Sequence, residues 1–426
     1  MLSGLGQGGQ GGLDTLGGFL LAVGVVLLCS HLLGAVMTRF RQPPVVGEIA
    51  AGLLIGPSAL GAVWPSGQAV LFTPEVIAAI DLAAQLGLVM FMFQIGAELR
   101  VDKLRGHGRT VGFVVTGAML LPFLAGLGLA SLLRQRLVDP ATSPVTYTLF
   151  LGVALSITAL PVLARILGDF GLAGTRLAAL ALTCAAIGDF VAWVTLTLIF
   201  TVAGIGCSGD GLTGMLTIPI FAVFVLACVR PSLAVLVRFV ARLREGPELL
   251  CPLLVVGAVG FASVTHAVGL HPVIGAFLFG AITPRNLVSI TRVSAQFHGF
   301  TMVILLPLFF ATIGLSTSVT LIGGDWGNWL AFALVLLVAV VSKFAGTIFG
   351  ARLAGLERRA LFPLGAMMNC RGVTELVVAS IGLRYQLINQ LGFTILVLTA
   401  LITTVLTGPA LQAWLHSHAG HPAGTA

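Results

Sequence analysis

Charged residues are scarce in this chain of 426 residues, since Asp, Glu, Lys and Arg make up only 9%. Soluble domains carry about 25% of such residues. Hydrophobic residues make up 58%, so the composition excludes an ordinary soluble domain and predicts an integral membrane protein. The net charge of +7 comes without a basic patch interleaved with aromatic residues, and we therefore expect no nucleic-acid partner.

Cysteine motifs and an amino-terminal targeting signal are also missing. The 6 cysteines are scattered and form no CxxC pair, which argues against a disulfide framework and a metal cluster. No Lys or Arg occurs in residues 1–15, so the first apolar run is predicted to be a retained membrane span rather than a cleaved signal. No cofactor is predicted.

Long apolar runs dominate what is present. A helix needs about 20 apolar residues to cross the hydrocarbon core of a bilayer. Runs that meet this criterion lie at 16–38, 43–62, 74–98, 110–133, 144–168, 174–203, 213–230, 248–267, 270–284, 296–320, 327–351, 358–382 and 389–414. The predicted fold class is an all-α polytopic membrane protein with about 13 transmembrane helices.

The basic residues between these runs alternate in the way that membrane topology requires. With the N-terminus outside, the outer loops hold only Arg134, Arg136 and Arg384, and the other basic residues outside the spans fall in inner loops. We therefore predict a multi-pass protein of the cell membrane with a cytoplasmic C-terminus. The short tail after the last run predicts no cytosolic regulatory domain.

Two charged residues lie deep within apolar runs. Asp189 occurs in LAALALTCAAIGDFVAWVTLTLIFTVAG, and Lys343 occurs in VLLVAVVSKFAGTIFG. A charge at this depth costs roughly 2.5–3.5 kcal/mol on insertion scales, and such residues usually bind ions, carry protons or pair with another charge. Asp189 is therefore the first candidate for an ion site. Lys343 is predicted to be either a stabilising counter-ion or a carrier of protons.

The fifth run, LFLGVALSITALPVLARILG, contains a helix breaker. Pro161 removes one backbone donor and clashes with the carbonyl four residues earlier, and Ser156 and Thr158 precede it. An ordinary proline kink would explain this run, and so would an interrupted helix. Irregular backbone at membrane depth survives only inside protein or beside an aqueous cavity.

Polar residues interrupt the twelfth run, LGAMMNCRGVTELVVASIGL. They are Asn369, Arg371, Gly372, Thr374 and Glu375. Arg371 and Glu375 have the i, i+4 spacing of a helix, which predicts a structural ion pair on one face. Such a pair is compatible with a functional role, because an interrupted helix needs groups that stabilise its two inner ends.

The two interrupted runs occur in mirrored order. The first precedes the run with Asp189, and the second follows the run with Lys343. The twelfth run comes seven places after the fifth, an odd number, so the chain crosses the membrane in opposite directions at the two places. Inverted repeats with interrupted helices are typical of secondary transporters, in which the site lies near the midplane between the repeats.

At this point the sequence resembles the monovalent cation:proton antiporter 2 family, which includes Kef-type potassium efflux proteins and plant cation/proton exchangers. The similar stretches follow one another along nearly the whole chain. They are PPVVGEIAAGLLIGPSALG (43–61), FMFQIGAELR (91–100), LSITALPVLARILGDFGL (155–172), AAIGDFVAW (185–193), GLHPVIGAFLFGAITPR (269–285), LLPLFFATIGLSTSV (305–319) and MMNCRGVTELVV (367–378).

The resemblance implies a sodium/proton antiporter-like fold formed by one transporter domain, 1–426, with two crossed discontinuous helices. It further implies a homodimer in membrane lipid and elevator-type alternating access. The implied segments are a core bundle at 110–203 and 327–414, a dimerisation bundle at 16–98 and 248–320, and a linker helix at 213–240.

The resemblance also implies roles for individual residues. Asp189 matches the essential ion-binding aspartate, and Lys343 matches the basic residue of the core. The remaining candidates fall on the two discontinuous helices, namely Ser156, Thr158 and Pro161 on the first and Asn369, Arg371 and Glu375 on the second. One position departs from the family, because Gly188 stands where Asp or Asn is usual.

These observations predict the exchange of Na⁺ or K⁺ for protons at Asp189. Burial favours the neutral form of a carboxylic acid and a nearby cation favours the charged form, so one carboxylate can hold either a proton or a metal cation. Ser156, Thr158 and backbone carbonyls would complete the cation shell.

Two other classes of protein are compatible with parts of the sequence. An uncoupled or gated K⁺ efflux pathway would use the same residues without proton exchange. An intramembrane aspartyl enzyme is a remote alternative, suggested by Gly188-Asp189 and Pro409-Ala410-Leu411. Such enzymes need a second intramembrane aspartate, and none lies in a neighbouring run. The chain is therefore not expected to be an enzyme.

Overall fold

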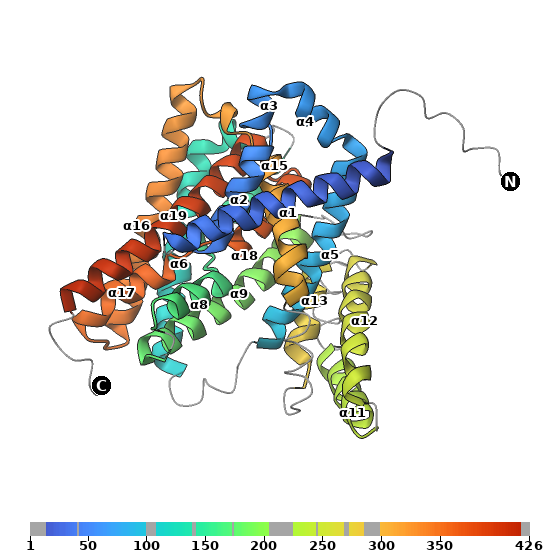
Figure 1. Cartoon of the computed structure of the whole chain (residues 1–426). Helices are drawn as coiled ribbons and strands as arrows, with labels where there is room; N and C mark the ends of the chain where they lie inside the picture. The colour runs from blue at the N-terminus through green and yellow to red at the C-terminus, as the bar shows by residue number, and fades with distance from the viewer. Residues whose placement is uncertain are drawn as a thin grey trace.

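The computed structural model describes residues 14–40, 42–98, 108–138, 142–172, 174–203, 225–243, 246–267, 272–284 and 299–418. Within these ranges the protein is built from helices without strands (Figure 1). Nine of the described helical segments are long and apolar enough to cross a membrane. The prediction of an all-α multi-pass membrane fold is therefore confirmed.

The long helices follow the predicted runs closely. They are α1 (Thr15–Arg39), α5 (Pro74–Glu98), α6 (Gly108–Leu137), α9 (Arg176–Val202), α12 (Gly246–Ala267), α16 (Trp326–Leu353) and α19 (Gln390–His418). The second, ninth and tenth runs form shorter helices, α2 (Pro44–Ile55), α13 (Pro272–Ile282) and α15 (Leu306–Ser316), the last preceded by the π-helical turn η3 (Thr301–Leu305). Most of the seventh run, 213–230, lies outside the described residues.

Two short helices and an amphipathic one were not anticipated as separate elements. The chain after α2 continues through α3 (Leu60–Val63) and α4 (Pro65–Leu71), because Gly56 and Pro57 end the apolar helix before the run itself ends. The described part of the predicted linker forms the π-helical turn η2 (Val225–Val229) followed directly by α11 (Arg230–Ala241).

Glycines bring α6 and α16 into close contact. A Cβ atom at Gly117 would lie 2.2 Å from the carbonyl oxygen of Gly346, and one at Gly346 would lie 2.1 Å from the carbonyl oxygen of Gly117. Small residues let helix backbones approach where lipid supplies no hydrophobic drive for association. Helices α6 and α16 also pack against the interrupted helices, so they form one group with α9 and α19.

A second glycine crossing joins α5 and α13. A Cβ at Gly96 would lie 2.1 Å from the carbonyl oxygen of Phe277, and one at Gly280 would lie 2.1 Å from that of Phe93. Helices α1, α12 and α15 pack around this pair, and α2 packs on α1 and α15. The described chain thus contains a second group of helices with its own internal crossing.

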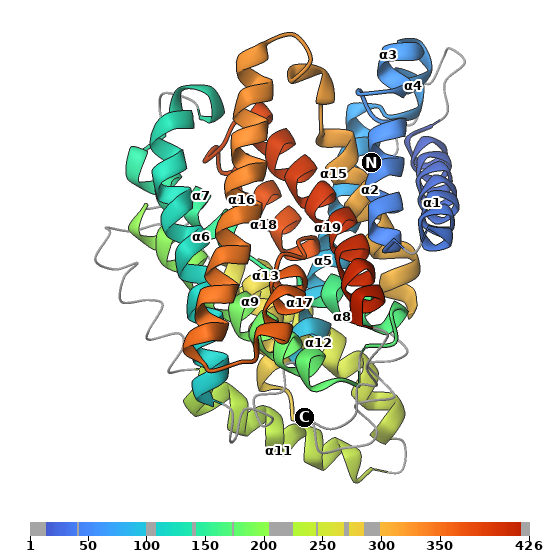
Figure 2. The ribbon, with the colours of Figure 1, turned by 90° about the vertical axis from the view of Figure 1, so that its left-hand side faces the viewer.

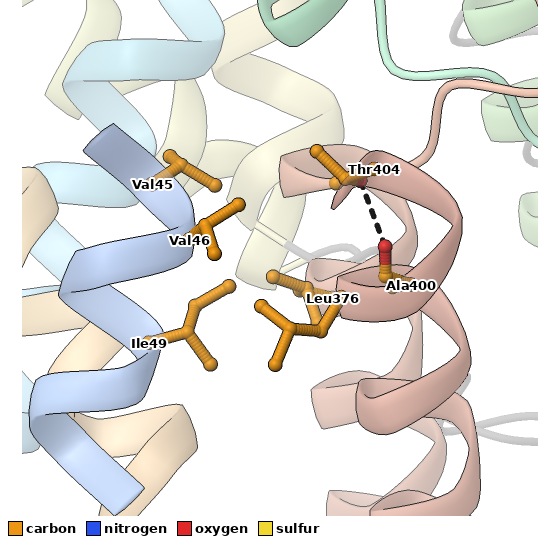
Figure 3. Close-up of a pocket in the computed structure, with 8 residues that line it drawn as sticks. Val45, Val46, Ile49, Leu376, Ala400 and Thr404 are labelled. Carbon is orange, nitrogen blue, oxygen red and sulfur yellow. Dashed lines mark hydrogen bonds between the residues drawn. The ribbon is translucent and has the colours of Figure 1, made fainter. Parts of the chain in front are cut away.

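The two groups meet along a thin apolar seam. Its clearest part is a narrow crevice between α2 on one side and α18 (Val373–Arg384) and α19 on the other, where Val46 and Ile49 point toward Leu376 and Ala400 (Figure 3). At one end of the seam, Arg384 donates to the carboxylate of Asp81 over 3.1 Å, with both side chains about half exposed. The side chain of Gln42 donates to the carbonyl of Val405, and that of Gln390 donates to the carbonyl of Ser316. The groups are therefore joined here by apolar side chains, one surface ion pair and two hydrogen bonds, without a glycine crossing.

A surface network ties the end of α6 to the start of α16. The Nη1 atom of Arg136 lies 2.7 Å from the carboxylate of Asp325 and 3.0 Å from the side-chain oxygen of Asn328. Asp325 also accepts a hydrogen bond from the backbone of Gly327, which makes it the N-cap of α16. The hydrogen bond from the Arg136 guanidinium holds the pKa of Asp325 below its usual range.

This ion pair predicts a pH-dependent part of the stability. Because the folded pKa of Asp325 is lowered, the pair stabilises fully above the unfolded value of about 3.9, and its contribution is lost as pH falls through the folded value. Asp325→Asn keeps the capping oxygen and removes the charge. We expect the wild type to melt slightly above this variant at pH 7 and the gap to close toward pH 3 in detergent solution. A gap that stays constant with pH would contradict this origin.

Candidate ion site at the crossing of two interrupted helices

Both predicted interruptions are present in the structure. Helix α7 (Pro144–Ser156) stops before residues 157–159 and the chain resumes as α8 (Leu160–Asp169), with Pro161 in its first turn, where a missing N–H costs nothing. Helix α17 (Arg358–Met368) likewise stops before residues 369–372 and resumes as α18 (Val373–Arg384). The fifth run is therefore an interrupted helix and not an ordinary proline kink.

The two interruptions cross and hold each other. The backbone N–H of Ala159 donates to the carbonyl of Cys370 over 3.1 Å, and the hydroxyl of Thr158 donates to the carbonyl of Met368 over 3.0 Å. A Cβ atom at Gly372 would lie 2.7 Å from Cγ2 of Val162, so only glycine fits this approach without a shift. Backbone groups that have no partner within their own helix at one interruption thus form hydrogen bonds with the other interruption.

Two basic side chains stabilise the carboxyl end of α7. Arg371 donates to the carbonyls of Leu155, at 2.6 Å, and of Ala154, at 3.3 Å. The ammonium of Lys343 donates to the carbonyl of Ser156. The last carbonyls of a helix lack partners within it and carry partial negative charge, so buried cations are favoured there.

Arg371 also forms the ion pair that its spacing predicts. Its guanidinium lies 2.9 Å from Oε1 of Glu375, and both side chains are fully buried. Glu375 is in the first turn of α18, where the partial positive charge of the helix end favours a carboxylate. The hydroxyl of Thr404 on α19 donates to the carbonyl of Arg371 and so fixes the interruption from a third side.

Asp189 faces the amino ends of both resumed helices. It is buried on α9, with 2% of its surface exposed, and its Oδ2 atom lies 3.5 Å from the hydroxyl of Thr374. The backbone N–H of Leu160, the first residue of α8, also hydrogen-bonds to this carboxylate. The site therefore combines one carboxylate with the positive ends of two half-helices.

Several oxygens at this crossing are buried without a protein hydrogen bond. Among the described residues they include Oδ1 of Asp189, Oδ1 of Asn369 and Oε2 of Glu375. Buried polar atoms in native proteins nearly always have a partner, so an orphaned group requires an explanation. Oxygens with free lone pairs are suitable ligands for a small monovalent cation or a proton.

The structure places the sequence-predicted residues around the crossing with different partners. The hydroxyl of Ser156 donates to the carbonyl of Val153 within its own helix, and that of Thr158 bridges to Met368. Both hydroxyls therefore keep lone pairs but neither is hydrogen-bonded to Asp189. Lys343 contacts the end of α7 and forms no ion pair with Asp189. Thr374 is among the polar residues of the twelfth run, but sequence reasoning did not assign it to the ion site, where it is the side chain that donates to Asp189.

Gly188 leaves room beside the carboxylate. A Cβ atom at this position would meet only Sδ of Met119, at 3.6 Å, an ordinary van der Waals distance. The family's usual polar residue is therefore not excluded by packing at this position.

Because of this space, we expect Gly188→Asn to increase the apparent affinity for the cation. If the crossing binds the cation that the sequence predicts, the added amide oxygen becomes a further ligand. A contribution of about 1 kcal/mol, the size of one hydrogen bond, then lowers the apparent KM for that cation about fivefold. Gly188→Ala adds the Cβ alone and is the matched control. Initial exchange rates in vesicles measure both variants, and equal KM values for Asn and Ala would contradict the expectation.

Comparisons with known proteins agree with this architecture. The family described as "Sodium/hydrogen exchanger, transmembrane" matches residues 24–416. The chain is 34% identical over 397 residues to the Na(+)/H(+) antiporter NhaS4 of Synechocystis sp., covering 93% of this chain and 97% of the relative. It is also 34% identical to Cation/H(+) antiporter 20 of Arabidopsis thaliana, where 92% of this chain matches 48% of the plant protein. The chain thus spans about half of that longer relative.

A solved structure shows the same fold. The sodium proton antiporter MjNhaP1 from Methanocaldococcus jannaschii matches with a TM-score of 0.63 and 17% identity, over 97% of this chain and 100% of that one. The sequence match along almost the whole chain and the shared fold lead to one conclusion: the protein belongs to the transmembrane sodium/hydrogen exchanger family.

Proposed function

We propose that the protein is a secondary active transporter that exchanges a monovalent cation, Na⁺ or K⁺, for protons at Asp189. The observation that carries the proposal is the buried carboxylate of Asp189, which faces two half-helix ends and keeps one oxygen without a hydrogen bond. The relatives named as cation/proton antiporters support the same function.

Competition for one carboxylate accounts for the coupling. Asp189 binds either a proton or a cation, and each neutralises its charge. The cation shell consists of Asp189, lone pairs of Ser156 and Thr158, the free oxygen of Asn369 and backbone carbonyls at the interruptions. Such oxygen ligands replace the hydration shell of Na⁺ or K⁺. A neutral site crosses an apolar barrier at much lower cost than a charged one.

The seam between the helix groups supports alternating access of the elevator type. The core bundle, 110–203 and 327–414, carries the site, and the bundle of 16–98 and 248–320 provides a scaffold and the interface of a homodimer. Contacts within each group are held by glycine crossings, whereas Ile49 and Leu376 meet across the seam as apolar side chains (Figure 3). Sliding along these apolar surfaces breaks the hydrogen bonds that Gln42 and Gln390 form across the seam and leaves the hydrogen bonds within the helices intact.

The orientation follows from the distribution of basic residues. The N-terminus is outside and the C-terminus is in the cytoplasm, which places Arg136, Asp325 and Arg384 together at the outer surface. Their contacts, Arg136 with Asp325 and Arg384 with Asp81, join helix ends that this topology assigns to the same side.

The test is an exchange assay in proteoliposomes. An imposed pH gradient is followed by an internal pH dye while Na⁺, K⁺, Li⁺ or Rb⁺ is added, at several pH values and with the membrane potential either free or clamped. We expect one or two of these cations to collapse the gradient with saturation. Cation flux that neither moves protons nor responds to the gradient would contradict exchange and favour the uncoupled K⁺ pathway.

Lys343→Gln separates the two roles considered for the buried lysine. Because its ammonium binds the carbonyl of Ser156 and not Asp189, we expect the variant to lose about 1.5–3 kcal/mol of stability, the value of a hydrogen bond to a charged group, and to retain exchange. Thermal unfolding in detergent and the exchange assay are measured on the same preparation. Unchanged stability with abolished exchange would instead identify Lys343 as a proton carrier.

A further inference from the structure

Helix α11 has no part in the ion site. Together with η2 it forms a continuous helical stretch from Val225 to Ala241. It packs against α12, and in both overall views it lies at the lower end of the molecule (Figures 1 and 2). In Figure 2 it runs across this end, whereas α16 runs along the length of the molecule.

The helix has apolar side chains on two sides. Leu233 and Val237, four residues apart, are buried against the protein. Val235 and Phe239, also four residues apart, are 64% and 62% exposed, and Leu236 and Leu243 are exposed beside them. The packing of α11 on the protein therefore accounts for the first pair but not for the second.

Basic side chains border the exposed apolar stripe. Arg238 and Arg242 are four residues apart and both are exposed. No Asp or Glu occurs between 225 and 243. The Nε atom of Arg238 donates to the carbonyl of Ala234 over 2.9 Å, so this side chain lies along its own helix. An exposed apolar stripe flanked by arginines alone distinguishes α11 from an ordinary polar surface helix.

We propose that α11 lies in the membrane–water interface and binds the anionic phospholipid surface. Its apolar stripe enters the boundary between headgroups and acyl chains, and Arg238 and Arg242 bind lipid phosphates, as amphipathic basic helices do. Charge complementarity selects an anionic over a zwitterionic surface. That this surface is the inner leaflet rests on the proposed orientation; the binding itself does not depend on transport.

The position of α11 in the chain gives this contact a consequence. The helix follows the segment after α9 of the core group and precedes α12 of the other group. A helix anchored on lipid at this place restrains the connection between the two groups, so the lipid composition acts on both of them.

Quenching by brominated lipid tests the proposal on the full chain. Phe239→Trp adds one indole to the 5 native tryptophans. The fluorescence of the native tryptophans is measured on the wild-type protein and subtracted. Two vesicle preparations contain the same mixture of phosphatidylcholine and phosphatidylglycerol. In one of them part of the phosphatidylcholine is brominated, and in the other the same amount of phosphatidylglycerol is brominated. We expect the added fluorescence to be quenched more by brominated phosphatidylglycerol, with a local enrichment of about fivefold per arginine.

Two double variants control for charge. Arg238→Gln with Arg242→Gln should abolish the excess quenching by phosphatidylglycerol. Arg358→Gln with Arg359→Gln removes two exposed arginines elsewhere and should leave the excess unchanged. Equal quenching by the two lipids would overturn the anionic preference, and absence of quenching by both would overturn the interfacial position. Neither result depends on whether the protein exchanges ions.

Discussion

Asp189→Asn should abolish cation-dependent collapse of an imposed pH gradient while leaving the protein folded. Asparagine has nearly the same shape and keeps an acceptor for Thr374 and the backbone N–H of Leu160. It can neither bind a proton at neutral pH nor balance the charge of a cation. The exchange rate in proteoliposomes should fall to the level of empty vesicles, with a thermal midpoint close to that of the wild type.

Asp81→Asn is the matched control for this substitution. Asp81 is also an aspartate on a membrane helix, but it is about half exposed and pairs with Arg384. Its replacement should leave exchange largely intact, since an exposed ion pair contributes at most about 1 kcal/mol. Full exchange by the Asp189→Asn protein would refute the assignment of the ion site, whereas loss in both variants would indicate a general effect of removing acids.

Arg371→Met should be the most destabilising single change at the crossing. It leaves the fully buried Glu375 without its partner and removes the donor to the carbonyls of Ala154 and Leu155. Removing one member of a buried ion pair typically costs about 3–5 kcal/mol. We expect a marked fall in the thermal midpoint in detergent and a reduced yield of folded protein.

The pair itself is tested by a double-variant cycle. Combining Arg371→Met with Glu375→Leu removes both charges and should be more stable than Arg371→Met alone, because no buried charge is left unpaired. Arg384→Met, at the exposed end of α18, should cost no more than about 1 kcal/mol. Strictly additive effects of the two buried substitutions would show that the ion pair contributes no coupling energy.

The sequence predicted the parts of this site that have a local signal. Asp189 and Lys343 stand out because charge is costly within an apolar run. Pro161 marks the first interruption, and the i, i+4 spacing of Arg371 and Glu375 predicts their ion pair, although Arg371 itself lies in the interruption ahead of α18. Each of these inferences needs only residue type and spacing along one helix, and the structure contains both interrupted helices and the ion pair.

The partners across the fold could not be predicted in this way. Lys343 and Arg371 bind backbone carbonyls of α7. Every residue has a backbone carbonyl, so the sequence does not indicate which ones accept these hydrogen bonds. Thr374 reaches Asp189 only because the two interruptions cross. The division of α2 from α3 and α4 depends on where one glycine ends a helix, and α11 was hidden within a predicted linker because its apolar stripe resembles the end of a span.

The crossing also has a consequence for biosynthesis. Asp189 and the Thr374 hydroxyl beside it are 185 residues apart, and chains are made from the N-terminus. Helix α9 is therefore synthesised and inserted before α18. The carboxyl end of α7 is likewise made before Lys343 and Arg371, which donate hydrogen bonds to its carbonyls. Until α18 is inserted, the buried carboxylate of Asp189 in the nascent protein lacks the Thr374 hydroxyl.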